Sequence, residues 1–201
     1  MSVAVALTYP LGATPLDPDE LASLIPSHLT TQAELNEWEQ LNIQQGDTWA
    51  RTQRKEILNE AFVRQLHRRM FGDTWRWAGS FRKSDKNIGI DWPKISVELR
   101  KLLDDVQYQI EHATFPPDEI AVRFHHRMVA IHLFPNGNGR HARLMADLIV
   151  ERLGQFRFTW GRRSLVDASL IDATPVRQAY IAALQAADAR DYAPLLAFAR
   201  S

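Results

Sequence analysis

Two helical patterns joined by a short turn constrain this fold more than any other feature of the sequence. Between Pro117 and Ile131 the apolar residues recur at helical spacing, and a proline followed by two acidic residues is typical of a helix N-terminus. A Pro-Asn-Gly turn follows, and a second helical pattern runs from about Gly139 to Leu153, just before Gly154. The sequence therefore predicts a mostly α fold of roughly six to nine helices around a central antiparallel pair.

The turn between these two patterns has the features of a phosphate site. Its residues Asn136-Gly137-Asn138-Gly139 lead directly into the N-terminus of the second helix. A helix N-terminus offers unpaired backbone N–H groups and a partial positive charge, both of which suit an anion. The two glycines permit positive φ angles and leave room for a ligand to approach the backbone.

Charged and polar side chains around the turn indicate which chemistry it could support. Arg140 and Arg143 are three residues apart and share a helix face, and two guanidinium groups beside an anion site favour a polyphosphate. His132, at the end of the first helix, is a candidate general base for an attacking hydroxyl. Asn136 is a candidate metal ligand, through its oxygen or through water. Singly, each residue is also explained as a cap, a turn residue or a solvated charge, but their coincidence favours a functional site.

The stretch from His132 to Arg143, H-L-F-P-N-G-N-G-R-H-A-R, resembles the Fic family motif H-x-F-x-[DE]-G-N-[GK]-R-x-x-R. The chain as a whole is similar to the Fic subgroup called mobile mystery protein B. The resemblance implies a Fic-type helical domain that transfers AMP from ATP to a Ser, Thr or Tyr hydroxyl of a target protein. It makes His132 the general base, Phe134 an anchor in the core, and Asn138, the loop amides and both arginines the phosphate-binding groups.

Two positions depart from the family motif. Leu133 stands where proline is common, which should be a minor change in the loop. Asn136 stands where many members carry Asp or Glu to hold Mg²⁺, and a neutral amide is a weaker ligand for that hard cation. The resemblance therefore implies ATP as substrate and Mg²⁺ as cofactor, with a weak metal ligand at Asn136.

A helix is predicted from Thr30 to about Gln45, and Glu34 in it has two interpretations. Thr31 and Glu34 fit a capping box, in which each side chain bonds to the backbone at the other end of the first turn. Many Fic proteins instead carry an inhibitory helix with the pattern [ST]-x-x-x-E-[GN], which Thr30 and Glu34 match apart from a leucine in the last position. The resemblance then implies that Glu34 pairs with Arg143 and holds the enzyme inactive.

A small β-hairpin is predicted between Phe81 and Trp92. Fic domains carry a hairpin flap here that covers the site and aligns the target segment. The resemblance places Ile88, Gly89 and Ile90 in this target-docking flap, where backbone pairing along a strand edge would position a substrate hydroxyl. The alternative is a surface hairpin without a ligand.

The remaining segments are predicted to be scaffold. The histidines at 125 and 126 are expected to pack or to form hydrogen bonds rather than to bind a metal. An extended piece is predicted from Gln155 to Trp160, and further helices are predicted at 18–24, 49–71, 95–112, from 164 or 167 onward, 174–188 and 192–198. We expect residues 1–29 to form an N-terminal arm and residues 30–201 to form the Fic domain, including the inhibitory helix at 30–45.

Composition limits the partners. Lys and Arg number 24, as do Asp and Glu, and this balance argues against nucleic acid as a partner. The chain has no cysteine for disulfides or thiol chemistry. No apolar run approaches the ~18 residues of a membrane helix, and residues 1–7 lack a basic segment, so no membrane association is expected. The expectation is a cytoplasmic protein that acts on a protein substrate of unknown identity, with self-association left open.

Three other functions remain open for the same residues. The site could transfer another phosphate-containing group, because a reversed nucleotide would present a different phosphorus to His132. It could remove AMP from a modified protein, with Glu34 orienting a water molecule. It could also be a catalytically weak nucleotide-binding module, a reading that Asn136 favours.

Overall fold

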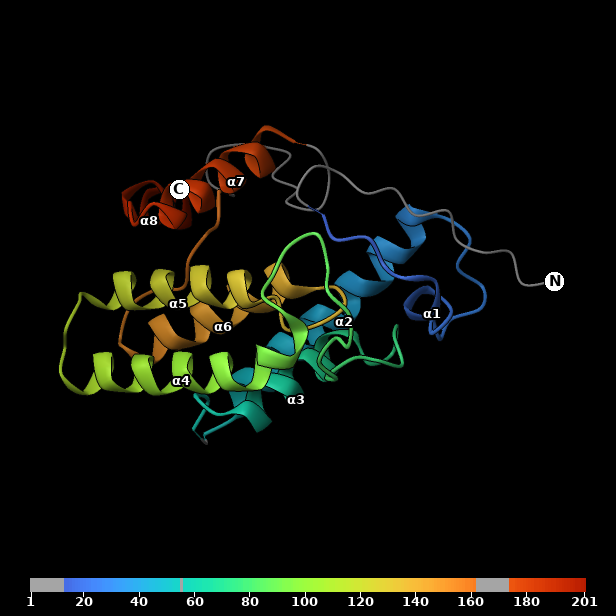
Figure 1. Cartoon of the computed structure of the whole chain (residues 1–201), viewed down its shortest axis with the longest axis horizontal. Helices are drawn as coiled ribbons and strands as arrows, with labels where there is room; N and C mark the ends of the chain where they lie inside the picture. Colours follow the sequence, from blue (N-terminus) through green and yellow to red (C-terminus); the bar gives the residue numbers. More distant parts are fainter. Residues whose placement is uncertain (1–12, 55, 162–173) are drawn as a thin grey trace.

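The computed structural model describes residues 13–54, 56–161 and 174–201. These residues form eight α-helices and one short 3-10 helix, as Figure 1 shows, and the only β-pairing among them is an isolated bridge between Leu24 and Trp75. The mostly α fold class is therefore confirmed. No helix in these ranges is long and apolar enough to cross a membrane. The helices are α1 (Pro18–Leu21), α2 (Gln32–Thr52), α3 (Glu60–Phe71), η1 (Trp92–Lys94), α4 (Ile95–Glu111), α5 (Pro117–Ile131), α6 (Asn138–Arg152), α7 (Pro175–Asp188) and α8 (Ala193–Arg200).

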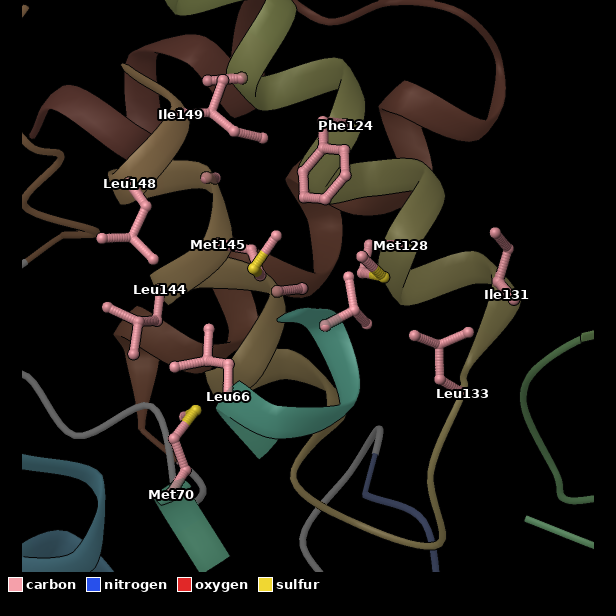
Figure 2. Close-up of a cluster of buried hydrophobic side chains, with 14 of the residues drawn as sticks. Leu66, Met70, Phe124, Met128, Ile131, Leu133, Leu144, Met145, Leu148 and Ile149 are labelled. Carbon is pink, nitrogen blue, oxygen red and sulfur yellow. The ribbon is translucent and has the colours of Figure 1, made fainter. Parts of the chain in front are cut away.

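Helices α5 and α6 form the predicted central pair. They pack against each other, α4 lies along α5, and α3 contacts α6 (Figure 1). Side chains of α3, α5 and α6 meet in one buried cluster, shown in Figure 2, and burial of each large apolar side chain stabilises the fold by about 1.5–3 kcal/mol. The labelled members are Leu66, Met70, Phe124, Met128, Ile131, Leu133, Leu144, Met145, Leu148 and Ile149. This packing fixes the turn between α5 and α6, and with it the candidate site.

The predicted boundary between the second and third helices was wrong. One helix, α2, continues to Thr52, and α3 begins only at Glu60. Gly46 lies inside α2, where that helix crosses α3. A Cβ added there would stand 2.8 Å from Met70 Cγ, so the close crossing needs a glycine. The break falls later, where the Asn59 side chain accepts a hydrogen bond from Phe62 N at 2.8 Å and caps α3.

The predicted hairpin between Phe81 and Trp92 is absent from the described structure, which has an irregular loop there. The cause is Arg82, whose buried guanidinium group donates to the carbonyl oxygens of Ser84 at 2.8 Å and of Ile90. These bonds satisfy backbone groups inside the loop that would otherwise pair between strands. We refer to residues 81–91 as the flap loop.

The predicted extended piece at 155–160 is not helical and joins no β-ladder. The N–H groups of Thr159 and Trp160 instead donate to the carbonyl oxygen of Ala199 in α8, at 2.9 and 3.1 Å. The predictions of α4, α5, α7 and α8 are confirmed within two residues at each end. The helix predicted from Ser164 or Asp167 lies outside the described residues.

The N-terminal arm lies on the helical domain from residue 13 onward. Its short helix α1 is held by the Trp77 indole, which donates to the Glu20 carbonyl oxygen at 3.1 Å. Beyond α1, Ile25 N donates to the Thr74 carbonyl oxygen at 2.8 Å, beside the isolated bridge. The chain that precedes α1 lies beside the turn between α5 and α6, where Thr14 contacts His132 and Asn136.

Candidate active site

His132 ends α5 in a left-handed backbone conformation, with φ 58° and ψ 68°. For a residue with a Cβ this conformation costs about 1–2 kcal/mol, so the surroundings must hold it. Arg82 does so, because its Nε donates to the His132 carbonyl oxygen at 2.7 Å and its backbone N–H donates to the Leu133 carbonyl oxygen at 3.0 Å. The flap loop thus fixes the direction in which the imidazole points.

The His132 imidazole is buried and uncharged at neutral pH. The residue is 6% exposed, and its Nε2 lies 3.0 Å from the Thr14 hydroxyl oxygen. Burial lowers the pKa of His132 to about 4, with smaller contributions from the positive charges of Arg82 and Lys86. A neutral imidazole with its proton on Nδ1 presents a lone pair at Nε2, as a general base requires.

The turn after His132 is held by His67, a residue that the sequence analysis did not select. Its ring stacks on Phe134, with 3.7 Å between ring centroids. His67 Nδ1 accepts from the Gly79 N–H at 3.0 Å, so Nε2 carries the proton and donates to the Asn136 carbonyl oxygen at 3.1 Å. Phe134 is fully buried, as its predicted role as a core anchor requires.

The Asn138 side chain shapes the loop from within. Its Oδ1 accepts from Phe134 N at 2.9 Å, and its Nδ2 donates to the Phe134 carbonyl oxygen at 2.7 Å. The Asn138 side chain is therefore engaged with the loop. An anion would meet the backbone N–H groups of residues 138–140, which have no acceptor within α6. Gly137 has φ 78°, and a Cβ there would stand 2.6 Å from the Phe71 ring, so the turn needs this glycine.

Asn136 does not fit the predicted role of metal ligand. Its Oδ1 accepts from Gly137 N at 2.6 Å and from Arg140 Nη2 at 3.4 Å. Each contact places a donor hydrogen at Oδ1, the oxygen that would face a metal ion. The contact from Arg140 also places a full positive charge there. A divalent cation needs the opposite surroundings.

Both motif arginines lie at the start of α6, but in different surroundings. Arg140 Nη1 pairs with Glu39 Oε2 of α2 at 2.6 Å, and its guanidinium group lies over the Phe71 ring. Arg143 lies over the Tyr180 ring, and a Cβ added at Gly139 would be 3.5 Å from its Nη1. The structure therefore brings both guanidinium groups beside the turn, as predicted, and adds Glu39, which the sequence analysis did not select.

Glu34 forms the predicted helix cap. Its Oε2 accepts from the N–H groups of Thr30 and Thr31 at 2.8 and 3.0 Å, while Thr31 Oγ1 accepts from Glu34 N at 3.2 Å. These backbone hydrogen bonds lower the pKa of the exposed Glu34 carboxyl. Inhibition through Arg143 would need a different direction of this carboxylate, and it stays a prediction.

The predicted flap residues lie over His132 although they form no hairpin. Gly89 has φ 116°, and a Cβ added there would stand 2.7 Å from both His132 Cβ and Arg82 Nη2. Ile90 is held through its carbonyl oxygen by Arg82, and Ile88, just before Gly89, is half-buried. The flap loop is thus in place beside the general base, held by a buried side chain rather than by strand pairing.

The other two histidines of α5 form hydrogen bonds, as predicted. His125 Nε2 lies 3.0 Å from the buried Tyr180 hydroxyl, and His126 Nε2 lies 2.8 Å from Asp188 Oδ1. Both contacts tie α5 to α7. A cleft of about 860 Å³ lies elsewhere, along α2 and α3, and none of its lining residues belongs to the motif.

Comparison with known proteins shows what this chain is similar to. Residues 57–150 match the model of the Fic/DOC family. The protein adenylyltransferase fic-1 of Caenorhabditis briggsae is 34% identical over 97 residues, which are 46% of this chain and 19% of that protein. The protein adenylyltransferase Fic of Nematostella vectensis is 29% identical over 106 residues, or 51% of this chain and 25% of that protein. The chain thus matches about a fifth to a quarter of the length of these curated relatives.

Solved structures show the same fold. The N-terminal FIC domain of Bep8 from Bartonella sp. 1-1C superposes with a TM-score of 0.66 at 12% identity, covering 87% of this chain and 88% of that one. BepC of Bartonella tribocorum, solved with bound AMPPNP, gives a TM-score of 0.63 at 18% identity, covering 86% and 87%. Residues 57–150 thus match the Fic/DOC family model, and the described chain has the same fold as these solved FIC domains.

Proposed function

We propose that this protein is an adenylyltransferase that moves AMP from ATP to a hydroxyl group of a protein. The observation that carries the proposal is the neutral, buried His132, which lies just before the turn that leads into α6. Its Nε2 lies 3.0 Å from the hydroxyl oxygen of Thr14. The relatives named protein adenylyltransferases support this reaction, and the neighbour solved with AMPPNP supports a nucleoside triphosphate as donor.

In the proposed reaction the triphosphate lies at the N-terminus of α6. Its phosphates accept hydrogen bonds from the first-turn N–H groups, and Arg140 and Arg143 balance their charge. The target hydroxyl oxygen attacks the α-phosphorus, its proton passes to His132 Nε2, and pyrophosphate leaves. Alignment of the hydroxyl and the phosphate supplies most of the acceleration, because the nucleophile needs no other activation than removal of its proton.

Magnesium has no step in this proposal. The Asn136 side-chain oxygen already accepts from Gly137 N and from Arg140. We expect a requirement for Mg²⁺ to arise from the oxygens of the triphosphate rather than from an amide ligand.

The finer sequence predictions remain part of the proposal. They are inhibition by Glu34, membership of the mobile mystery protein B subgroup, a cytoplasmic location, and a protein target whose identity is open. Division into an arm at 1–29 and a Fic domain at 30–201 is a further prediction, as is self-association.

The test is transfer of label from ATP to protein. ATP labelled at either the α- or the γ-phosphate is incubated with the protein and a cell extract as the source of acceptors. We expect protein-bound label only from the α-position, lost in His132→Ala and retained in the matched control His112→Ala, an exposed histidine of the α4 C-terminus. Label from the γ-position alone would indicate another transferred group. Equal labelling by His132→Ala would contradict the assigned base.

Release of AMP from an already modified protein would favour the reverse reaction. Nucleotide binding by calorimetry, without any labelled product, would favour a binding module. Each outcome selects one of the alternatives that the sequence left open.

A further inference from the structure

The hydroxyl nearest to the general base belongs to the chain itself. Thr14 Oγ1 lies 3.0 Å from His132 Nε2, and Thr14 is 6% exposed. In the tautomer that a general base requires, with the proton on Nδ1, Nε2 accepts and the Thr14 hydroxyl is the donor. In that tautomer the hydroxyl proton lies between the Thr14 oxygen and the nitrogen that would remove it.

The backbone around Thr14 is held from both sides like that of a bound peptide. Asn87 of the flap loop donates through Nδ2 to the Ala13 carbonyl oxygen at 3.1 Å. On the other side, Asn136 Nδ2 lies 3.5 Å from the Thr14 carbonyl oxygen. The next residue, Pro15, favours an extended backbone at Thr14. An extended segment thus runs between the flap loop and the motif turn, the place expected for a target segment.

Charged contacts fix the register of this segment. Lys86 of the flap loop is almost fully buried and pairs with Asp17 at 2.7 Å and with Glu20 at 2.6 Å. Ser84 also donates to Asp17, at 2.7 Å. Figure 1 shows the green flap loop rising beside the blue chain that precedes α1. With Asp17 fixed three residues further on, the chain cannot slide to offer another side chain to His132.

The sequence offers no competing hydroxyl in this register. Between Tyr9 and Ser23, Thr14 is the only residue that carries one. The hydroxyl is also the hydrogen-bond partner of the buried His132 Nε2. A valine of similar shape would fill the same space but would leave that nitrogen without this partner.

We propose that Thr14 is a self-modification site, at which this chain accepts AMP in cis from a bound nucleoside triphosphate. The inference rests on the adenylyltransferase function proposed above. The Thr14 oxygen forms a bond to the α-phosphorus as the bond from that phosphorus to the β-phosphate bridging oxygen breaks. The hydroxyl proton passes to His132 Nε2, and pyrophosphate leaves with the bonding electron pair. The product is a phosphodiester between Thr14 and adenosine.

The test uses the full chain with α-labelled ATP, and the modified residue is mapped by mass spectrometry of its peptides. We expect one adenylate at Thr14, no chain label at this site in Thr14→Val, and restored label in Thr14→Ser. The matched control Thr48→Val removes an exposed hydroxyl that bonds within its own helix to Gln44, and it should label as the wild type does. Circular dichroism of each variant checks that it is folded.

Two further observations, the dependence of the rate on protein concentration and the position of the label, separate failure of this inference from failure of the proposed function. In a cis reaction the initial rate per chain is independent of protein concentration, whereas a rate that rises in proportion to concentration would overturn the cis assignment. Label on extract proteins or on other residues of this chain, with none at Thr14, would overturn the inference and leave the proposed function standing. No label on any protein, either with the wild type or with Glu34→Gly, in which the predicted inhibition is removed, would overturn both.

Discussion

Glu39 and Arg140 form an ion pair of 2.6 Å that joins α2 to the first turn of α6. Both side chains are largely buried, at 7% and 18% exposed, and the other carboxylate oxygen of Glu39 accepts from the Trp75 indole at 2.7 Å. The motif arginine Arg140, which a triphosphate would need, is therefore already paired with a carboxylate. Nucleotide binding should compete with this pair.

Glu39→Gln should strengthen nucleotide binding. The glutamine oxygen can keep the Trp75 hydrogen bond, while the negative charge beside the phosphate site is lost. We expect about tenfold tighter binding of a non-hydrolysable ATP analogue, equivalent to about 1.4 kcal/mol, measured by calorimetry. Glu37→Gln, an exposed position on the same helix, is the matched control. Weaker binding by Glu39→Gln would show instead that Glu39 orients Arg140 for the phosphates.

Arg82→Met should change both the pKa of His132 and the rate of transfer. The positive charge of Arg82 helps to lower the pKa of His132, so its removal should raise that pKa, which NMR titration of the imidazole would measure. The left-handed backbone of His132 would also lose its support, and a displacement of about 1 Å can cost ~100-fold in rate. Arg100→Met, at an exposed site, is the control. An unchanged His132 pKa would contradict the electrostatic link.

Stability should fall as the pH drops below about 6.5. Burial lowers the pKa of His125 to about 3, those of His132 and His141 to about 4, and that of His67 well below 6.5. The unfolded chain then takes up protons that the folded chain does not, so these histidines stabilise the fold above pH 6.5 and lose that contribution toward their folded pKa values. Each could cost up to about 2 kcal/mol at about pH 5.

The measurement is urea unfolding at neutral pH and at about pH 5. Burial raises the pKa of Asp147 to about 6, and this carboxyl works in the opposite direction, so it offsets part of the loss. A free energy of unfolding that is equal at both pH values would contradict the burial of neutral histidines.

Glu34→Gly tests the inhibitory prediction against the helix cap. Both Glu34→Gly and Thr31→Ala break the capping box, so both should weaken the first turn of α2. If Glu34 also restrains Arg143, only Glu34→Gly should raise the rate of AMP transfer, which labelling from α-labelled ATP would measure. We expect that difference. Equal rates in the two variants would leave Glu34 with the cap alone.

The sequence predicted the parts of this fold that local patterns encode. The central pair, α4 and α7 followed from apolar periodicity and from Pro, Thr and Gly at helix ends. The motif turn was found because its residues are contiguous. The α2 boundary was missed because the predicted helix ended at about Gln45, whereas Gly46 lies inside α2, close to Met70 of α3.

The supporting residues of the site could not be found in this way. Arg82, Glu39 and His67 act on residues about 50 to 100 positions away in the chain, and nothing near them in the sequence indicates those partners. Thr14 lies in a segment without periodicity, so its place beside His132 appears only in three dimensions. The flap hairpin was predicted from short apolar pieces, and a buried arginine overrode their preference for strands.

The most direct test of the central claim is a crystal structure of the full chain with a non-hydrolysable ATP analogue. The account predicts phosphates at the N-terminus of α6, with Arg140 turned from Glu39 toward them. It also predicts the α-phosphorus as the phosphorus closest to the hydroxyl oxygen that faces His132 Nε2. A γ-phosphorus in that place, or phosphates bound away from the motif turn, would contradict it.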